Sequence, residues 1–301
     1  MTDTPTPMPE TGSDQLLGFT IASRNCRGRM VRLGNVLDEI LSAHDYPPAI
    51  KLVLAEALVL ATLMGGLLKE QGDQLTLQAQ AKGGVISLLV CDYRNGELRG
   101  YVEHDPAEFD RLGANPGLAE MFGEGYLAIT FDMAGPAQRY QGIVPLEGAS
   151  LTGAVEAYFA QSEQVPTLIR TAVRSGAAGN VAAGMLVQHL PDGEEGRERL
   201  HVRFDEPEWE HVSVMAASVS PAELLEQDLS LEAILWRLYH EEEAILVSPG
   251  SRLVRGCRCT LVHFEEVLAR FAKEDRREMA NEDGVILVDC AFCSRQFRVQ
   301  D

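Results

Sequence analysis

The chain carries two close cysteine pairs near its C-terminal end, Cys257-Arg258-Cys259 and, after thirty intervening residues, Cys290-Ala291-Phe292-Cys293. Two short pairs separated by a helix-sized insert are typical of a closed tetrahedral thiolate site, because each pair supplies two ligands from one turn. Zinc–sulfur bonds of about 2.3 Å hold four sulfurs roughly 3.8 Å apart, so the two pairs must meet in space. We therefore predict one zinc ion bound by these four cysteines, with zinc favoured over iron.

Other uses of the four cysteines fit the sequence less well. Four buried thiols or two structural disulfides are alternatives, but persistent disulfides are not expected in a chain without an export signal, and clustered thiolates repel each other without a metal. A thioredoxin-like dithiol at Cys290 and Cys293 needs a long helix that starts at the pair, whereas the eight residues after Cys293 look extended. His263 lies on a charged helix face, so we do not expect it to be a ligand.

The cysteines belong to a segment, residues 251–301, that is too small to fold on a hydrophobic core alone. A core of this size rarely contributes more than ~3–5 kcal/mol. Zinc bound by four thiolates contributes ~10–16 kcal/mol in comparable small modules. Oxidants attack thiolates, each pair is close enough in sequence to form a disulfide, and a disulfide sulfur is a poor zinc ligand. We expect oxidation to release the ion and unfold the segment in one event.

The charge of the chain argues against nucleic acid as a partner. The formal net charge is −19 and the pI is about 4.8, whereas proteins that bind nucleic acid usually carry a basic surface. Residues 251–301 hold nine Lys/Arg and nine Asp/Glu, so the excess acid lies before them. Residues 191–250 alone hold fifteen Asp/Glu against four Arg.

Composition and turn signals divide the chain into four parts. Residues 1–13 are rich in Thr and Pro and read as a disordered tail without a signal peptide, so we expect a cytoplasmic protein. Residues 14–190 read as an α+β core domain, with an antiparallel sheet whose hairpin turns are Gly83-Gly84 and Asn95-Gly96. Residues 191–250 are predicted to be an acidic helical linker, and residues 251–301 a zinc-binding redox-switch domain.

Several helix boundaries follow from local signals. Asn35, with Asp38 three residues later, predicts a capped helix. The apolar run from Ala49 to Leu68 is long enough to cross a membrane, but it contains Lys51 and Glu56, so we predict a buried core helix and no membrane partner. Thr260 predicts the start of a last long helix.

The linker is predicted to be only marginally stable. Ser220-Pro221-Ala222-Glu223 is a complete helix-start signature, and Ser230 opens a second helix, Leu231 to Tyr239. That helix ends in three glutamates, which interact unfavourably with the negative end of the helix dipole. If these helices pack on another part of the chain, their release exposes apolar side chains able to hold unfolding proteins. The candidate client-binding residues are Leu224, Leu225, Leu235, Trp236 and Leu238.

From about Leu16 onward the chain resembles the heat-shock protein 33 family of redox-regulated holdase chaperones. The resemblance rests on the cysteine spacing and on five further motifs: Trp236-Arg237-Leu238-Tyr239-His240-Glu241-Glu242-Glu243, His44-Asp45-Tyr46-Pro47, Tyr140-Gln141-Gly142, Ser162-Glu163-Gln164 with Pro166, and Ala183-Gly184-Met185-Leu186. The chain departs from the family at Ser294, where glycine is frequent, and at Phe297, where tyrosine is common.

The resemblance implies an ATP-independent chaperone that is not an enzyme and that binds unfolding proteins under oxidative and heat stress. It implies one zinc on the four cysteines in the reduced, inactive form. It also implies two disulfides in the oxidised form, Cys257–Cys259 and Cys290–Cys293, and a homodimer as the active form. Two rival functions remain: a permanently folded zinc-ribbon interaction module, and a thiol oxidoreductase.

Overall fold

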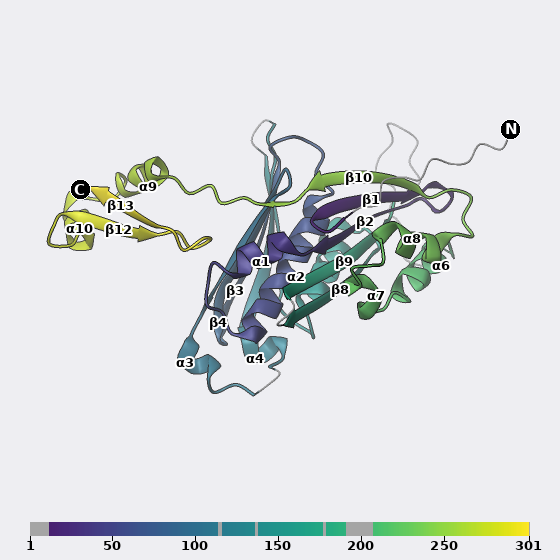
Figure 1. Cartoon of the computed structure of the whole chain (residues 1–301), viewed down its shortest axis with the longest axis horizontal. Helices are drawn as coiled ribbons and strands as arrows, with labels where there is room; N and C mark the ends of the chain where they lie inside the picture. The colour runs from purple at the N-terminus through teal and green to yellow at the C-terminus, as the bar shows by residue number, and fades with distance from the viewer. Residues whose placement is uncertain (1–11, 114–115, 136–137, 177–178, 191–206, 301) are drawn as a thin grey trace.

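The computed structural model describes residues 12–113, 116–135, 138–176, 179–190 and 207–300. Within these ranges the chain forms two antiparallel-rich sheets, helices between and outside them, and a small C-terminal unit (Figure 1). The predicted α+β class is confirmed. The predicted disordered tail, except for its last two residues, and the start of the predicted linker, 191–206, lie outside the described residues.

The first sheet has five strands in the order β10-β1-β2-β9-β8. Every neighbouring pair in this sheet is antiparallel. The strands have the following bounds: β1 Gln15–Ile21, β2 Cys26–Leu33, β8 Thr167–Gly176, β9 Gly179–His189 and β10 Leu246–Arg252. A short turn of 3-10 helix, Ala22–Arg24, joins β1 to β2. Because β10 follows the last linker helix and pairs with β1, this sheet joins the first strand of the chain to the segment after the linker helices.

The second sheet has six strands in the order β11-β5-β4-β3-β6-β7. The two residues of β11 pair with β5 in parallel, and the other pairs are antiparallel. The strands have the following bounds: β3 Gln74–Gly83, β4 Ile86–Arg94, β5 Glu97–His104, β6 Gly123–Asp132, β7 Arg139–Pro145 and β11 Val254–Arg255. The hairpin predicted at Asn95-Gly96 joins β4 to β5, and both residues have a positive φ, as a tight two-residue turn requires.

Helix α2, Pro48–Gly65, fills the space between the two sheets (Figure 1). Among the described residues it is the one helix long and apolar enough to span a membrane. Most of its side chains are buried in the main hydrophobic core together with the inner faces of both sheets, so protein rather than lipid covers it. The prediction of a buried core helix is confirmed, although the helix ends at Gly65, three residues before the predicted Leu68. The smaller helices at the margins of this core are α1 Asn35–Leu41, α3 Pro106–Phe109, α4 Leu118–Phe122 and α5 Leu151–Tyr158, which continues into a π-helical turn, Phe159–Glu163.

The start of α1 differs from its prediction. The N-cap is Gly34, and no side chain of α1 caps its own first turn. Instead, the carboxylate of Asp14 accepts hydrogen bonds from the backbone N–H of Gly34 at 2.8 Å and of Val36 at 3.4 Å. Asp38 accepts bonds from the backbone and side chain of Asn180. Asp14 therefore accepts the hydrogen bonds at the start of α1 that we expected the side chain of Asn35 to accept.

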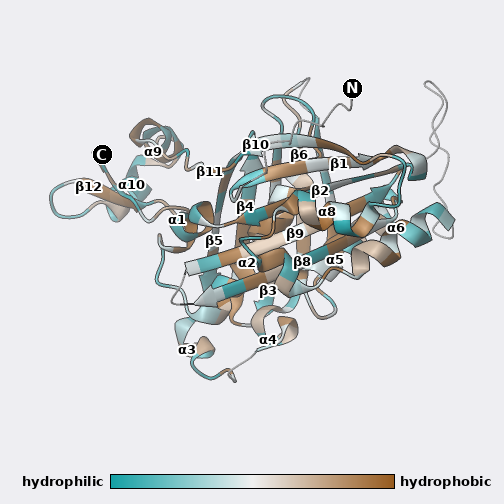
Figure 2. Cartoon of the chain, turned by 45° about the vertical axis from the view of Figure 1, so that its right-hand side comes forward, coloured by the Kyte–Doolittle hydropathy of each residue, from teal (hydrophilic) through white to brown (hydrophobic). Residues whose placement is uncertain are grey.

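Three helices cover the outer face of the five-stranded sheet. They are α6 Pro207–Ala217, α7 Pro221–Leu225 and α8 Leu231–Tyr239, and Figure 2 shows α6 and α8 lying against the apolar strands of this sheet. Their buried side chains form a second hydrophobic cluster with strand residues such as Phe19, Met30 and Met185. The capping box at Ser220 and the helix after Ser230 are confirmed. Strand β10, which follows them, was not predicted.

The C-terminal unit extends away from the two sheets (Figure 1). Helix α9 spans Leu261–Leu268 and is capped by Thr260 as predicted, but it ends after eight residues, and α10, Lys273–Met279, follows it. Strands β12, Val285–Asp289, and β13, Gln296–Gln300, form a hairpin. The part of this unit that the structure describes has a core of three buried side chains, Leu268, Ile286 and Val299.

Candidate metal centre

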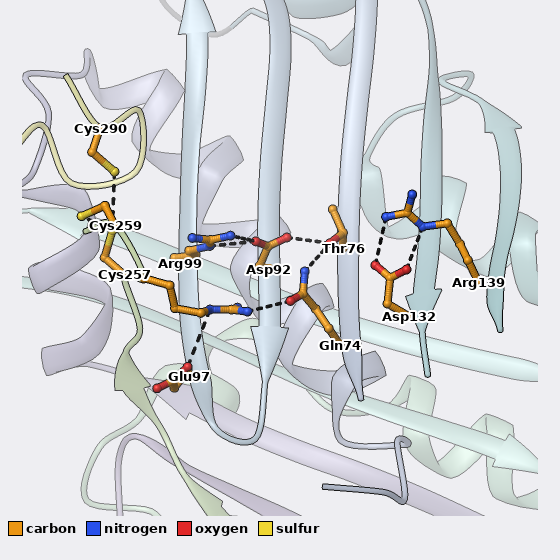
Figure 3. A network of polar contacts seen from close by, with 11 residues as sticks. Gln74, Thr76, Asp92, Glu97, Arg99, Asp132, Arg139, Cys257, Cys259 and Cys290 are labelled. Atoms are coloured by element: carbon orange, nitrogen blue, oxygen red, sulfur yellow. Dashed lines mark hydrogen bonds and ion pairs between the residues drawn. The ribbon is translucent and has the colours of Figure 1, made fainter. Parts of the chain in front are cut away.

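The four predicted cysteines come together in space. The Sγ of Cys257 lies 3.3 Å from that of Cys259 and 3.6 Å from that of Cys290, and the Sγ of Cys259 lies 3.4 Å from that of Cys293. All four sulfurs lie within 4.8 Å of one another, and Figure 3 shows three of them converging beside the six-stranded sheet. Sulfurs around a tetrahedral zinc are separated by roughly 3.8 Å. The donor set and its spacing therefore fit a zinc ion.

Two different backbone features place the two pairs. Cys257 and Cys259 follow β11 directly. Cys290 and Cys293 lie in the turn of the β12–β13 hairpin, where the N–H of Cys293 and of Ser294 both donate to the carbonyl of Cys290, at 3.2 Å and 2.8 Å. Ser294 has a φ of 55°, a left-handed conformation that glycine adopts at less cost. The backbone conformation at position 294 thus favours glycine, the residue that is frequent there in the family that the chain resembles.

The thiols influence one another's ionisation. Burial acts against ionisation of Cys257, but hydrogen bonds from the backbone of Cys259 and from the neighbouring thiols outweigh it and lower the pKa of Cys257 to about 7. Burial is the main cause that raises the pKa of Cys259, and the hydrogen bond with the Cys257 thiol raises this pKa further. Burial also raises the pKa of Cys290. Four thiolates this close require a cation to balance their charge.

The hydrophobic support of the cluster is small. The described part of the C-terminal unit has one cluster of three buried aliphatic side chains, much smaller than the clusters of the two sheets. A hydrophobic core in a module of this size rarely contributes more than ~3–5 kcal/mol, and the clustered thiols are the groups placed to add a cross-link.

The remaining cysteines and His263 do not take part. His263 is not among the clustered donors, and its backbone N–H donates to Thr260 at the helix start. Cys26 and Cys91 are buried in the sheets. Burial raises the pKa of Cys26 to about 12 and raises that of Cys91 strongly, which keeps both thiols protonated. The interpretation of Cys91 as a small core residue is confirmed.

The candidate client-binding residues divide into two groups. Leu224, Leu225, Leu235 and Leu238 are buried between the linker helices and the five-stranded sheet. Trp236 is 66% exposed, and its ring lies tilted against that of His240, with the centroids 5.0 Å apart. Sequence reasoning did not identify the apolar strand face beneath these helices. The alternation of Leu17, Phe19 and Ile21 along β1 was the signal that could have indicated it.

Comparison with known proteins agrees with this arrangement. The family model described as "Hsp33 protein" matches residues 14–300. The 33 kDa chaperonin of Caulobacter vibrioides is 36% identical over 300 residues, covering 97% of each chain. That of Yersinia pestis is 35% identical over 287 residues, covering 94% of this chain and 91% of the relative. The crystal structure of the 33 kDa chaperonin (heat shock protein 33 homolog) from Thermotoga maritima matches with a TM-score of 0.77 at 22% identity, over 95% of both chains. The chain therefore belongs to the Hsp33 family.

Proposed function

We propose that this chain is a cytoplasmic, ATP-independent holdase chaperone that is switched on by oxidation. Its family supports a chaperone function. The observation that carries the finer proposal is the combination of four clustered thiols with a helical cover over an apolar sheet face. The partners are unfolding proteins, under oxidative and heat stress, and the active form is a homodimer. Neither nucleic acid nor a membrane is a partner.

In the reduced form, Cys257, Cys259, Cys290 and Cys293 hold one zinc ion. Bound zinc supplies the cross-link that the three-residue core of the C-terminal unit lacks. The four sulfurs are already clustered, so little backbone movement is needed to bind it. The chain is inactive in this state because α6, α7 and α8 cover the apolar face of the five-stranded sheet.

Oxidation closes one disulfide in each pair, Cys257–Cys259 and Cys290–Cys293. For each pair, two thiols and one hydrogen peroxide give one disulfide and two waters, so two electrons pass from sulfur to peroxide. The Sγ atoms of Cys257 and Cys259 must approach from 3.3 Å to about 2.05 Å. A disulfide sulfur donates poorly to zinc, so the ligand set is lost together with the fold of the unit.

Loss of the C-terminal unit loosens the linker. The linker helices then leave the sheet, and both the leucines on their inner faces and the strand residues beneath become available to unfolding proteins. The apolar residues on the helices are Leu224, Leu225, Leu235 and Leu238, and Trp236 is available already. The strong negative charge of the chain keeps such a complex in solution.

A peroxide titration at mild heat tests the proposal. Zinc release is followed with a chromogenic chelator, and aggregation of a thermolabile client by light scattering, in the same sample. We expect zinc release and client protection to rise together. Zinc release without protection of the client from aggregation contradicts the proposed chaperone function. Protection of the client by the fully reduced, zinc-loaded chain favours a permanently folded interaction module. Multiple turnovers in an insulin-reduction assay favour the oxidoreductase.

A further inference from the structure

The residues enclosed by the two cysteine pairs contact the core domain directly. Arg258 lies between Cys257 and Cys259, and Phe292 lies between Cys290 and Cys293. Arg258 reaches Gln74 of β3 and Glu97 of β5. Phe292 reaches Tyr101 of β5, so both side chains contact the six-stranded sheet. The thiol cluster therefore has its own attachment to the core, separate from the linker helices.

Phe292 is held by a cation and an aromatic ring. Its ring meets that of Tyr101 edge-on, with centroids 4.8 Å apart and an interplanar angle of 81°. The guanidinium carbon of Arg99 lies 3.9 Å from the centre of the Phe292 ring. Such contacts favour a defined position of the ring beyond simple burial.

The cation beside Phe292 is itself fixed by the sheet. The Nε of Arg99 donates to the carboxylate of Asp92 at 2.7 Å, and the hydroxyl of Thr76 donates to the same carboxylate at 2.6 Å (Figure 3). Asp92 is only 3% exposed. A buried chain of polar contacts across β3, β4 and β5 thus presents Arg99 to the C-terminal unit in one orientation.

Arg258 makes the second attachment. Its Nη1 donates to the Oε1 of Gln74 at 2.7 Å, and its Nε lies 3.8 Å from a carboxylate oxygen of Glu97. Within the described chain, its Nε and Nη2 are buried without a hydrogen-bond partner. Buried donors without partners reduce the stability of a contact, so this attachment is weak enough to be released.

Backbone and loop contacts complete the attachment. The N–H of Gly256, next to Cys257, donates to the carbonyl of Leu98 at 2.9 Å. A Cβ at Gly256 would lie 2.3 Å from the Cβ of Glu97, so only glycine permits this approach. The hydroxyl of Ser294, next to Cys293, is 3.0 Å from the Nδ1 of His44.

We propose that Arg258 and Phe292 are positioning residues that make attachment of the C-terminal unit to β5 and oxidation of the thiols mutually exclusive. Closing a disulfide across Cys257 and Cys259 must change the backbone of Arg258, the one residue between them. Closing one across Cys290 and Cys293 must change the backbone at Phe292. The attachment therefore stabilises the reduced form, and by linkage its loss favours oxidation by the same factor. This inference rests on the thiol chemistry proposed above.

Tyr101→Leu tests the inference from the core side, where no metal ligand is disturbed. The chain is equilibrated in glutathione buffers of graded potential, and free cysteines are counted by alkylation and mass spectrometry. Losing the ring contact should shift the thiol–disulfide equilibrium about tenfold towards the disulfides, which lowers the midpoint potential by about 30 mV. Zinc content of the reduced chain should be unchanged. Phe292→Leu should give a similar shift, and the double variant should shift little further, because both changes break one contact.

Two variants serve as matched controls. Tyr126→Leu removes a half-exposed tyrosine from β6 of the same sheet, and Phe271→Leu removes an exposed ring from the C-terminal unit. Both should keep the parent midpoint. An unchanged midpoint in Tyr101→Leu and Phe292→Leu, with zinc bound, would overturn the inference. Because the readout is a potential, a chain that shifts as expected yet protects no client would refute the proposed function and leave this inference standing.

Discussion

Cys290 is the most deeply buried of the four clustered thiols. Its Sγ lies 3.6 Å from that of Cys257, and its backbone carbonyl organises the turn that carries Cys293. We expect Cys290→Ser to weaken zinc binding by at least 100-fold, because a serine hydroxyl stays protonated and is a poor zinc ligand. Isothermal titration against a competing chelator measures the affinity. Cys91→Ala, which removes a buried thiol from β4, should keep full zinc content, and a zinc-saturated Cys290→Ser chain would refute the ligand assignment.

At the residue scale, the sequence predicts functional residues that lie close together along the chain. It does not predict residues whose partners are brought near only by the tertiary fold. The four cysteines could be assigned because two close pairs have few uses in a chain of this kind. Arg258 and Phe292 gave no such signal, since their partners Gln74 and Tyr101 lie more than 150 residues away. The predicted cap of α1 at Asn35 was wrong for the same reason, because Asp14, which binds the first turn of α1, is brought there by the tertiary fold.

Among the elements, the linker helices pack on the core through the second hydrophobic cluster, and one buried carboxylate adds a charged attachment. The side chain of Glu242, just after α8, is 5% exposed and accepts hydrogen bonds from Arg24 and Ser23 at 3.0 Å. His211 of α6 lies 3.3 Å from it, and Arg24 also pairs with Glu208 of α6. This cluster connects both ends of the helical cover to the turn between β1 and β2.

We expect Glu242→Gln to loosen the helical cover by about 1–2 kcal/mol at neutral pH, because Arg24 then loses a charged partner. Burial acts to raise the pKa of Glu242, but the hydrogen bonds from Arg24 and Ser23 hold the pKa below its ordinary value of 4.5. A lowered pKa stabilises the fold above pH 4.5, and this stability is lost as the pH falls through the folded-state pKa. The difference between parent and variant should therefore begin to shrink as the pH falls below 4.5 and disappear once the pH lies below the folded-state pKa of Glu242.

Urea unfolding followed by the fluorescence of Trp209, which α6 buries against the ring of His189, measures this difference. Glu243→Gln is the matched control, because Glu243 is exposed and carries the same charge. If the two variants unfold alike at neutral pH, Glu242 does not attach the cover.

The elements also differ in how well the sequence predicts them. The start of α7 agrees with its predicted start signal, and both bounds of α8 agree with the predicted range Leu231 to Tyr239. Strand β10 contains Pro249 and Gly250 and reads as a loop, and it is extended because it pairs with β1. A proline is tolerated there because β10 is an edge strand. The boundary placed at residue 250 falls inside this strand, so the division into domains stays a prediction.

At the scale of the whole molecule the cores are very unequal. The two sheets share extensive apolar clusters with α2 and the linker helices, whereas the hydrophobic cluster in the described part of the C-terminal unit has three buried members. We expect removal of zinc with a strong chelator to unfold residues 257–300 and leave the five-stranded and six-stranded sheets folded. Hydrogen exchange should show lost protection at β12 and β13 and retained protection at α2. Protected β12 and β13 amides in a metal-free chain would show that the unit folds without the ion.

The central claim is that one event at four thiols removes the metal and frees an apolar surface. Native mass spectrometry of one sample before and after peroxide, with an unfolding client added, tests it most directly. We predict one zinc and free thiols at Cys257, Cys259, Cys290 and Cys293 before oxidation, and afterwards no zinc, two disulfides and a complex with the client. A reduced chain that carries no metal, or an oxidised chain that keeps its zinc, would contradict the account.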